Sequence, residues 1–403
     1  MACAAIASVL TIASVIPIRS APPRADATVR ALSQASNSFG QDLAAHLPRT
    51  GNLVFSPFSI STALALALSG ARGATEEEMI RVLRHRLERR EIDAATAATR
   101  EILAHYNARS WLQKTSSARL EVANAVMLTP GSGITEDYLA AAEASYGAQV
   151  FRDGSVVAVN RWVEQKTDGK IAMLVDQLPA NTAAILLNAI YLKASWQKSF
   201  DPRLTRNEEF EISTTEKVRV PLMHREGRYP VATGNGYVAI RLPFHNPLLH
   251  MVIVLPNDLN QLDAVGARLD DVALAHLFAE LAKSEQLVSL ALPRFKIESK
   301  ASLTPPLSAM GLSRPFDRTQ ADFSGMTGGA RSLWIGDVAH AATIDVSEEG
   351  AEAAAATGVF VLASAPSHMI NFRVTRPFLF YVADDASGAI LFQGRVVDPR
   401  SGA

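Results

Sequence analysis

The sequence has almost no cysteine and no marked excess of either charge. Cys3 is the only cysteine among 403 residues, so disulfide frameworks and cysteine-based zinc sites are excluded. Lysine and arginine total 39 and aspartate and glutamate 40, which gives a net charge of −1. Such a chain has no overall field to attract nucleic acid or an anionic membrane. Its 48% of apolar residues is nevertheless enough to form a folded core.

The motifs of common enzyme classes are also missing. The sequence contains no G-x-S-x-G, H-E-x-x-H or P-loop string, and its nine histidines show no metal-ligand spacing. Ser195–Lys198 matches the S-x-x-K of penicillin-recognising enzymes, but no K-T-G follows. Gly234 and Gly236 are a fragment of a dinucleotide motif and are more typical of a turn between strands. The basic run over 81–91 is interleaved with glutamates, which favours a solvated helix face over a polyanion site.

The N-terminus is typical of an export signal. Residues 2–17 are apolar or small and uncharged, and Ala25 and Ala27 form an A-x-A cleavage site. The first basic residue is Arg19, after the apolar run, and a misassigned start codon or a membrane-tethered N-terminus would each account for that. We predict a signal peptide over 1–27 and a mature protein that is secreted, extracellular or periplasmic. No later stretch approaches 18 uncharged apolar residues.

The rest of the chain is predicted to be helical first and rich in strands later. Apolar spacing near 3.6 predicts a helix over 29–47, ended by Pro48. The stretch 59–71 is apolar nearly all round, which is typical of a buried helix. Helices are also predicted over 76–105, where mixed charges fall at helical spacing, and over 161–174, which Gly169 interrupts. Strand patterns cover 119–129, 184–192, 249–256, 287–293 and 389–397. No internal repeat and no linker rich in Ser, Gly or Pro divides the chain. The sequence therefore predicts one α+β domain over 28–400.

The stretch 348–367, EEGAEAAAATGVFVLASAPS, carries no charge from Ala353 onward. An exposed apolar loop of this length is an aggregation hazard, because it lacks the charges and prolines that protect edges. An alanine-rich helix is one interpretation, although GVFVL after Thr357 favours extended structure. In a strand, the odd-numbered residues from Ala351 to Ala363 would share one face, and all of them are small or β-branched. The stretch could therefore enter a sheet as a central strand.

Five long segments, in this order, resemble the serpin family, the loop-inserting inhibitors of serine proteases. They are NLVFSPFSISTALALALSGARGAT (52–75), VNRWVEQKTDGKI (159–171), LLNAIYLKASWQKSF (186–200), DFSGMTG (322–328) and RPFLFYVADDASGAILFQGRVVDP (376–399). The resemblance covers nearly the whole mature chain. It implies a fold of three β-sheets and about nine helices, with an exposed reactive-centre loop over about 348–367.

The same resemblance assigns roles to particular residues. EEGAEAAAAT resembles the family's inhibitory hinge EEGTEAAAAT, with alanine in place of threonine at position 351; alanine is small and uncharged, so insertion should not be blocked. The hinge residues are then Glu348, Glu349, Gly350, Ala351, Glu352, Ala353, Ala354, Ala355, Ala356 and Thr357. The polar cluster beneath the main sheet, the shutter, corresponds to Ser56, Ser59, Asn188 and His340. Trp196 matches the tryptophan of the breach, where the sheet first opens. His340 is also consistent with an ordinary buried histidine that has its hydrogen bonds.

The function implied is that of a single-use trap and not of an enzyme. A serine protease would be the covalent partner of a monomeric inhibitor, with no cofactor, metal or nucleic acid. Seventeen residues counted from Glu348 put the scissile bond at Ser364–Ala365, and a shift of one residue puts it at Ala363–Ser364. Small residues there suit elastase-like or subtilisin-like proteases. One alternative is a non-inhibitory serpin acting as a carrier or chaperone, and a hydrolase is disfavoured because no nucleophile–base motif is present.

Overall fold

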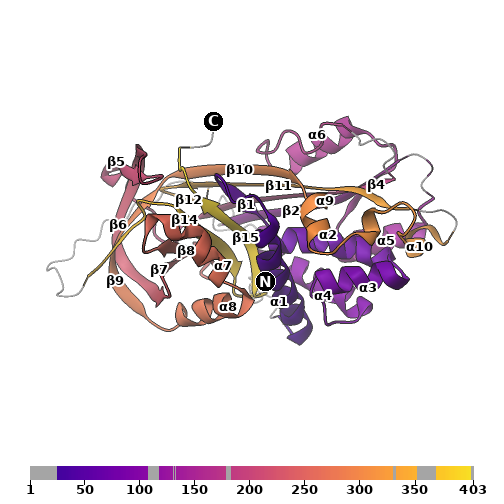
Figure 1. The fold of residues 1–403 in the computed structure, drawn as a ribbon, viewed down its shortest axis with the longest axis horizontal. Coiled ribbons are helices and arrows are strands. Elements are labelled where there is room, and N and C mark those ends of the chain that lie inside the picture. The colour runs from indigo at the N-terminus through magenta and orange to yellow at the C-terminus, as the bar shows by residue number, and fades with distance from the viewer. Residues whose placement is uncertain are drawn as a thin grey trace, which may run out of the picture.

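The computed structural model describes residues 25–107, 118–129, 131, 133–177, 183–329, 333–351 and 369–400. Most of the predicted signal peptide, residues 1–24, therefore lies outside the described residues, and so do 352–368 of the predicted reactive-centre loop. Figure 1 shows long strands running through the molecule, with most of the helices packed beneath one end of them and one helix, α6, lying over the opposite face.

The described residues form ten α-helices, close to the nine expected. They are α1 (Ala27–His46), α2 (Pro57–Gly70), α3 (Gly73–Val82), α4 (Arg89–Ala104), α5 (Glu136–Tyr146), α6 (Val156–Lys166), α7 (Leu262–Arg268), α8 (Asp271–Glu280), α9 (Thr304–Ala309) and the single turn α10 (Ser324–Thr327). Four short 3-10 turns complete the helical structure: η1 (His105–Asn107), η2 (Pro202–Leu204), η3 (Leu259–Gln261) and η4 (Arg314–Phe316). None of these helices is long and apolar enough to cross a membrane.

Local sequence explains where the first helices begin and end. The Asp26 carboxylate caps α1 by accepting from the Val29 N–H, and the helix ends two residues before Pro48. Ser56 caps α2 in the same way and Pro57 occupies its first position. Almost every residue of α2 is buried, as its uninterrupted apolar sequence predicts. This helix therefore lies under the main sheet, surrounded by other elements.

The main sheet contains six strands in the order β10-β11-β12-β4-β2-β3. Its members are β2 (Ala118–Leu128), β3 (Gln149–Phe151), β4 (Ala184–Ser195), β10 (Phe295–Ser302), β11 (Ile335–Ser347) and the two-residue β12 (Gly350–Ala351). The central strands β4 and β11 are parallel and also pair with each other directly. The strands predicted over 119–129 and 184–192 are β2 and β4.

The other strands form two further sheets that share the 18-residue strand β6 (Lys217–Gly234). One has the order β1-β15-β14-β8-β7-β6, and in the other β6 pairs with β5 and with β9, which also pairs with β13. The bounds are β1 (Leu53–Phe55), β5 (Arg206–Glu211), β7 (Tyr237–Pro243), β8 (Leu249–Pro256), β9 (Glu285–Pro293), β13 (Ile370–Arg373), β14 (Phe378–Asp384) and β15 (Ala389–Val396). Three sheets were expected, but β6 joins the second and third into one continuous nine-stranded sheet, so the described residues form two hydrogen-bonded sheets. Gly234 and Gly236 lie at the turn between β6 and β7.

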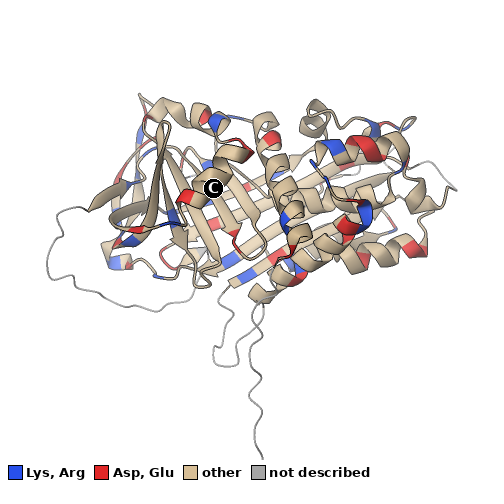
Figure 2. Cartoon of the chain, turned by 90° about the horizontal axis from the view of Figure 1, so that it is seen from below, with Lys and Arg blue, Asp and Glu red and all other residues tan. Residues whose placement is uncertain are grey.

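Two helix predictions were wrong in their boundaries. The stretch 76–105 is divided into α3 and α4, because Arg84 takes a left-handed φ of 59° and interrupts the first helix. The helix predicted over 161–174 begins earlier, at Val156, and ends at Lys166. Asp168 and Gly169 both have positive φ, so the chain turns there, and residues 171–175 continue as irregular backbone with bends. In Figure 2 the blue positions of Lys and Arg and the red positions of Asp and Glu are interspersed along the helices.

Candidate functional site

The centre of the main sheet is the junction between β4 and β11, which we call the seam. Along most of its length the two strands pair directly, from Ile335 opposite Ala184 to Thr343 opposite Tyr191. Beyond that point β12 lies between them, antiparallel to both. Ala351 is paired with Val346 of β11 and with Ala194 of β4. We call this the upper end of the seam. There Gly350 and Ala351 separate β4 from β11, and below them the two strands pair directly.

Gly350 makes this start of a central strand possible. Its φ is +136°, a conformation that side-chain-bearing residues rarely adopt. A Cβ atom there would lie 2.2 Å from the Ala194 carbonyl oxygen and 2.7 Å from the Ser195 Cα. Both of these are backbone atoms of β4 and cannot rotate away. Position 350 therefore requires glycine for as long as β12 lies in the seam.

Gly350→Ala is expected to expel β12 from the seam. The clash and the backbone strain together should destabilise the intact form by roughly 1–3 kcal/mol, because unfavourable φ values alone cost about that much. Hydrogen exchange should accelerate at the Trp196 amide, whose N–H now donates to the Glu349 carbonyl at 2.8 Å. Gly51→Ala is the matched control, since Gly51 has φ +72° with no atom within 4 Å of a built Cβ. Equal exchange at Trp196 in both variants would contradict the assignment.

Trp196 anchors the upper end of the seam. Its indole Nε1–H donates to the Ser347 carbonyl at 3.0 Å, and its ring stacks on Phe244 with centroids 4.7 Å apart. The Phe200 N–H donates to the Glu348 carbonyl at 2.8 Å. These bonds connect the segment after β4 to the segment after β11. Trp196 is 2% exposed, so the connection is shielded from water.

Glu348, the first predicted hinge residue, is buried in an ion pair. Its carboxylate accepts from Arg294 Nε at 2.7 Å and from the Thr205 hydroxyl at 2.5 Å, and only 4% of the residue is exposed. Burial alone would raise the pKa of Glu348, but the hydrogen bonds from Arg294 and Thr205 outweigh it and hold the pKa below its ordinary value. The base of the hinge is thus fixed to the rest of the protein just before the chain enters the seam.

The four predicted shutter residues meet in one buried network halfway along the seam. His340 and Asn188 are opposite each other in the β11–β4 register, and His340 Nδ1 lies 2.5 Å from Asn188 Oδ1. Asn188 Nδ2 donates to the Ser59 hydroxyl at 2.5 Å and to the Ser59 carbonyl at 3.0 Å. The Ser56 N–H donates to His340 Nε2 at 3.3 Å, and the Ser56 hydroxyl accepts from the Ser59 N–H. The network therefore ties both strands of the seam to α2.

These contacts fix the protonation state of His340. Because Nε2 accepts from the Ser56 N–H, the ring proton lies on Nδ1 and is donated to Asn188. Complete burial lowers the pKa of His340 to about 3, so the ring is neutral at physiological pH. A strand that entered the seam would separate His340 from Asn188. The His340–Asn188 hydrogen bond thus opposes opening of the sheet.

Sequence reasoning missed a fifth member of this network. Asn124 of β2 lies opposite Asn188, and its Oδ1 accepts from Asn188 Nδ2 at 2.6 Å. It is 2% exposed. Asparagine in the middle of the apolar run 122–128 was the available signal, since a buried amide requires partners. Arg294 and Thr205 were missed as well, and no local pattern distinguishes them from other surface residues.

Buried histidines make stability depend on pH. Burial lowers the pKa of His85 to about 4 and that of His250 and His340 to about 3. The unfolded chain binds these protons near pH 6.5 and the folded protein does not, so stability is complete above pH 6.5 and falls below it. Each histidine should lower the free energy of unfolding by about 1.4 kcal/mol for each pH unit below 6.5, so the three together lower it by about 4 kcal/mol per pH unit. Urea unfolding midpoints are expected to fall steeply between pH 6 and pH 4.

Substitution at His85 tests this pH dependence without breaking a hydrogen bond. Neither ring nitrogen of His85 has a hydrogen-bond partner among the described residues. His85 is one of three buried histidines that contribute to the pH dependence. His85→Leu should therefore reduce the slope of the unfolding free energy against pH by about one third. His276→Gln is the control, because that side chain is 75% exposed. A stability that stays constant from pH 6.5 to pH 4 would contradict the buried neutral histidines.

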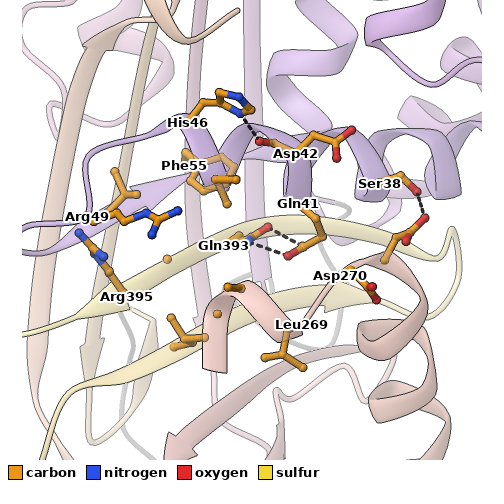
Figure 3. Close-up of a pocket in the computed structure, with 18 of the residues that line it drawn as sticks. Ser38, Gln41, Asp42, His46, Arg49, Phe55, Leu269, Asp270, Gln393 and Arg395 are labelled. Carbon is orange, nitrogen blue, oxygen red and sulfur yellow. Dashed lines mark hydrogen bonds between the residues drawn. The ribbon is translucent and has the colours of Figure 1, made fainter. Parts of the chain in front are cut away.

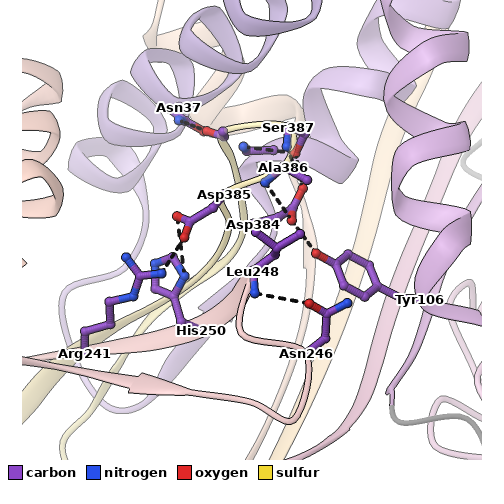
Figure 4. A network of polar contacts seen from close by, with 12 residues as sticks. Asn37, Tyr106, Arg241, Asn246, Leu248, His250, Asp384, Asp385, Ala386 and Ser387 are labelled. Atoms are coloured by element: carbon purple, nitrogen blue, oxygen red, sulfur yellow. Dashed lines mark hydrogen bonds and ion pairs between the residues drawn. The ribbon is translucent and has the colours of Figure 1, made fainter. Parts of the chain in front are cut away.

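A second polar cluster joins η1 to the end of β14 (Figure 4). The Tyr106 hydroxyl donates to Asp384 Oδ1 at 2.5 Å, and Asp384 Oδ2 accepts from the Ser387 hydroxyl and N–H. Burial, together with the neighbouring Asp384 charge, raises the pKa of Tyr106. Arg241 donates to Asp385, whose Oδ1 is 3.7 Å from the buried His250 Nδ1. Ser387 is fully buried and donates to a carboxylate, so the cluster stabilises the fold and presents no accessible nucleophile.

A pocket lies away from the seam, between α1, α7, α8 and the sheet that contains β15 (Figure 3). Its volume is about 750 Å³. Phe55, Leu269 and Tyr381 supply apolar surface. The charged lining is balanced, with the arginines Arg49, Arg81, Arg84 and Arg395 and the aspartates Asp42, Asp263, Asp270 and Asp271. The Arg395 guanidinium donates to the Pro48 and Gly51 carbonyls at 2.8 and 3.1 Å and pairs with Asp263.

Comparison with known proteins decides the family. The family model described as "Serpin (serine protease inhibitor)" matches residues 34–399. The chain belongs to the serpin family. A serpin-like protein of Thermococcus kodakarensis is 36% identical over 379 residues, covering 91% of this chain and 86% of its own. The human leukocyte elastase inhibitor is 30% identical, covering 91% of this chain and 99% of its own.

Solved serpin structures share the fold. Human thyroxine-binding globulin, solved with its thyroxine ligand, superposes with a TM-score of 0.81 at 26% identity, over 93% of this chain and 100% of its own. The predicted serpin fold is thereby confirmed. The remaining predicted site residues of this serpin are outside the described residues: hinge positions 352–357 and both candidate reactive bonds, Ser364–Ala365 and Ala363–Ser364.

Proposed function

We propose that this serpin is a single-use inhibitor of serine proteases that traps its target by inserting a loop into the seam. The observation that carries the proposal is β12, which lies between β4 and β11 and is antiparallel to both. A strand inserted along the whole seam would have this same direction and position. The hinge sequence after Ala351 is uncharged from Ala353 onward and free of proline as far as Ala365, so its residues are compatible with a central strand.

The proposed reaction begins as an ordinary proteolysis. The protease serine attacks the carbonyl of Ser364, its Oγ forms an ester with that carbon, and the Ser364–Ala365 peptide bond breaks. The serine proton passes through the protease histidine to the departing amine of Ala365. The chain N-terminal to the cut is then free at one end and carries the protease as an ester.

Insertion competes with hydrolysis of this ester. The freed segment continues β12 down the seam and gains backbone hydrogen bonds on both edges. Seventeen residues from Glu348 to Ser364 span about 56 Å at ~3.3 Å each. Such a displacement carries the protease to the opposite end of the sheet and distorts its active site before water completes the reaction. The release of stored strain makes the trap irreversible.

The sequence around the cut sets the target. Val361, Leu362 and Ala363 precede Ser364, and small side chains at the cut suit a shallow primary pocket. We therefore propose elastase-like or subtilisin-like targets; the relative named leukocyte elastase inhibitor is consistent with this choice. Trypsin-like enzymes require a cation and should be poor targets. Sequencing of the released C-terminal peptide should give an N-terminus at Ala365, or at Ser364 for the shifted register, and any other start would refute both.

A denaturing gel tests the proposal directly. Incubation of the full chain with pancreatic elastase and with subtilisin should give a band of the summed mass that survives boiling in detergent. A serpin that is only a substrate would give the cleaved chain without the band of summed mass. A non-inhibitory serpin would give either cleaved protein or no change. A hydrolase would leave the added protease untouched and fully active.

A small-molecule carrier is the second candidate, and the pocket of about 750 Å³ favours it. The lining holds four arginines and four aspartates, but Arg49 has no ion pair among the described residues, so apolar walls beside its guanidinium suit an amphipathic anion. The solved globulin that shares this fold is complexed with thyroxine. Titration with the anionic fluorophore anilinonaphthalene sulfonate should give one saturable site that weakens several-fold in Arg49→Ala, and unchanged titration would remove the carrier function. The covalent complex with elastase is measured in the same Arg49→Ala variant. The substitution should weaken binding by a carrier and leave trapping by an inhibitor unchanged, which separates the two candidates.

A further inference from the structure

Strand β6, which lies at the end of the molecule away from α3 and α4 (Figure 1), carries an arginine without an acidic partner. This residue, Arg225, is opposite Leu290 of β9 in the strand register. Its Nε and Nη1 atoms are buried, and neither has a hydrogen-bond partner among the described residues. No carboxylate within the same ranges acts on its charge. Because a guanidinium stays charged at neutral pH, this part of the fold contains an uncompensated cation.

Two aromatic rings hold this guanidinium in place. The Arg225 Cζ atom lies 4.4 Å from the centre of the Phe200 ring and 5.1 Å from the centre of the Tyr229 ring. Both aromatic residues are buried, at 2% and 3% exposure. Such contacts stabilise a cation but leave the N–H groups at its edge without acceptors. Arg225 as a whole is only half-buried, so its guanidinium is reached from solvent through Nη2, which is not among the buried atoms.

The Tyr229 hydroxyl is a second buried donor beside the guanidinium. Residues 225, 227 and 229 share one face of β6, because alternate residues of a strand point to the same side. Position 227 is glycine, and a Cβ atom there would lie 2.9 Å from the Tyr229 hydroxyl oxygen. The tyrosine ring therefore lies along the strand toward Arg225. Its hydroxyl also has no partner in the part of the chain that the structure describes, and burial raises the pKa of Tyr229, so the hydroxyl keeps its proton.

We propose that Arg225 and Tyr229 form a binding site for a carboxylate group. Both side chains present donors that have no acceptor, so the group they fit is an acceptor with a negative charge. The guanidinium fork matches the two oxygens of a carboxylate, and the tyrosine hydroxyl supplies one further donor. A bound carboxylate would compensate the cation and satisfy the buried hydroxyl. A free carboxylic acid and an acidic side chain of another protein share this chemistry.

Sodium acetate is the first probe, because it is a small carboxylate. Thermal melts of the full chain are compared in sodium acetate and in sodium chloride at equal ionic strength. Acetate should raise the melting midpoint in a saturable manner, since a ligand that binds only the folded state stabilises it. Arg225→Met should abolish this response. The control is Arg228→Gln, which removes a positive charge from an exposed position of the same strand and should leave the response unchanged.

Tyr229→Phe tests the hydroxyl with little change in packing, and it decides the question even where Arg225→Met does not fold. Without acetate, this variant should melt no lower than the unmodified protein, because it removes a buried hydroxyl that has no partner among the described residues. In the presence of acetate, binding should be about 10-fold weaker, as expected for the loss of one hydrogen bond to a charged group. An equal loss of stability with and without acetate would assign the hydroxyl a structural role and overturn the proposal.

Hydrogen exchange locates the effect of acetate in the structure. The Phe200 N–H donates to the Glu348 carbonyl at 2.8 Å, so acetate bound beside the Phe200 ring should slow exchange of this amide several-fold. A higher melting midpoint with unchanged exchange at Phe200 would mean that acetate acts elsewhere, and the site would have to be abandoned.

A blocked Gly-Glu-Gly peptide and its glutamine counterpart identify the source of the carboxylate. Competition with acetate by the glutamate peptide alone would support an acidic side chain of a protein partner. Competition by neither peptide would support a free carboxylic acid. Equal competition by both peptides would contradict recognition of a carboxylate. None of these measurements requires a protease, so the site is tested independently of loop insertion.

Discussion

Ala353→Arg is expected to convert this serpin from an inhibitor into a substrate. Ala351 is paired with Ala194 and Val346, and both of those side chains are buried in the main core at 1% exposure. Alternate positions of a strand share a face, so a strand continuing from β12 would place position 353 on the core face as well. Burying an unpaired guanidinium there costs several kcal/mol, and snorkelling relieves only part of it.

Slower insertion would let the protease complete hydrolysis and escape. Denaturing gels should show loss of the covalent complex, with cleavage at the same bond as in the unmodified protein. Glu352→Arg is the matched control, because position 352 belongs to the opposite face and should retain most inhibition. If both variants trapped protease equally well, the assignment of odd-numbered positions to the core would have to be abandoned.

The loop-cleaved protein is expected to melt at a higher temperature than the intact one. An inserted strand gains hydrogen bonds to β4 and β11, which the uncleaved segment makes only at Gly350 and Ala351 among the described residues. With about 1 kcal/mol for each added bond and about 2 °C for each kcal/mol, the midpoint should rise by at least about 10 °C. Calorimetry before and after cleavage measures the change, and equal midpoints would mean that no strand is added.

The sequence predicted the helices and strands whose periodicity is strong and failed where a single residue redirects the chain. α1 and α2 follow from apolar spacing and from caps at Asp26 and Ser56. The end of α6 does not, because residues 171–175 are apolar enough to continue a helix and only the positive φ at Asp168 and Gly169 turns the chain back. The irregular segment after α6 therefore lay within a helix that the sequence predicted over 161–174.

The candidate site was predicted in part for a similar reason. His340, Asn188, Ser56 and Ser59 were identified through the family resemblance, and the structure adds that they share one hydrogen-bond network. Asn124 joins them only because β2 pairs with β4 in one register, which local sequence does not encode. The ion pair of Glu348 with Arg294 joins residues 54 positions apart, and it depends equally on the assembled fold.

The most direct test is the crystal structure of the protein after cleavage of its loop. We predict that the chain continues from Gly350 and Ala351 as a full strand between β4 and β11, antiparallel to both. His340 Nδ1 and Asn188 Oδ1, now 2.5 Å apart, should then be separated by that strand. A cleaved protein in which β4 and β11 remain paired from Ile335 to Thr343 would contradict loop insertion and the inhibitory mechanism built on it.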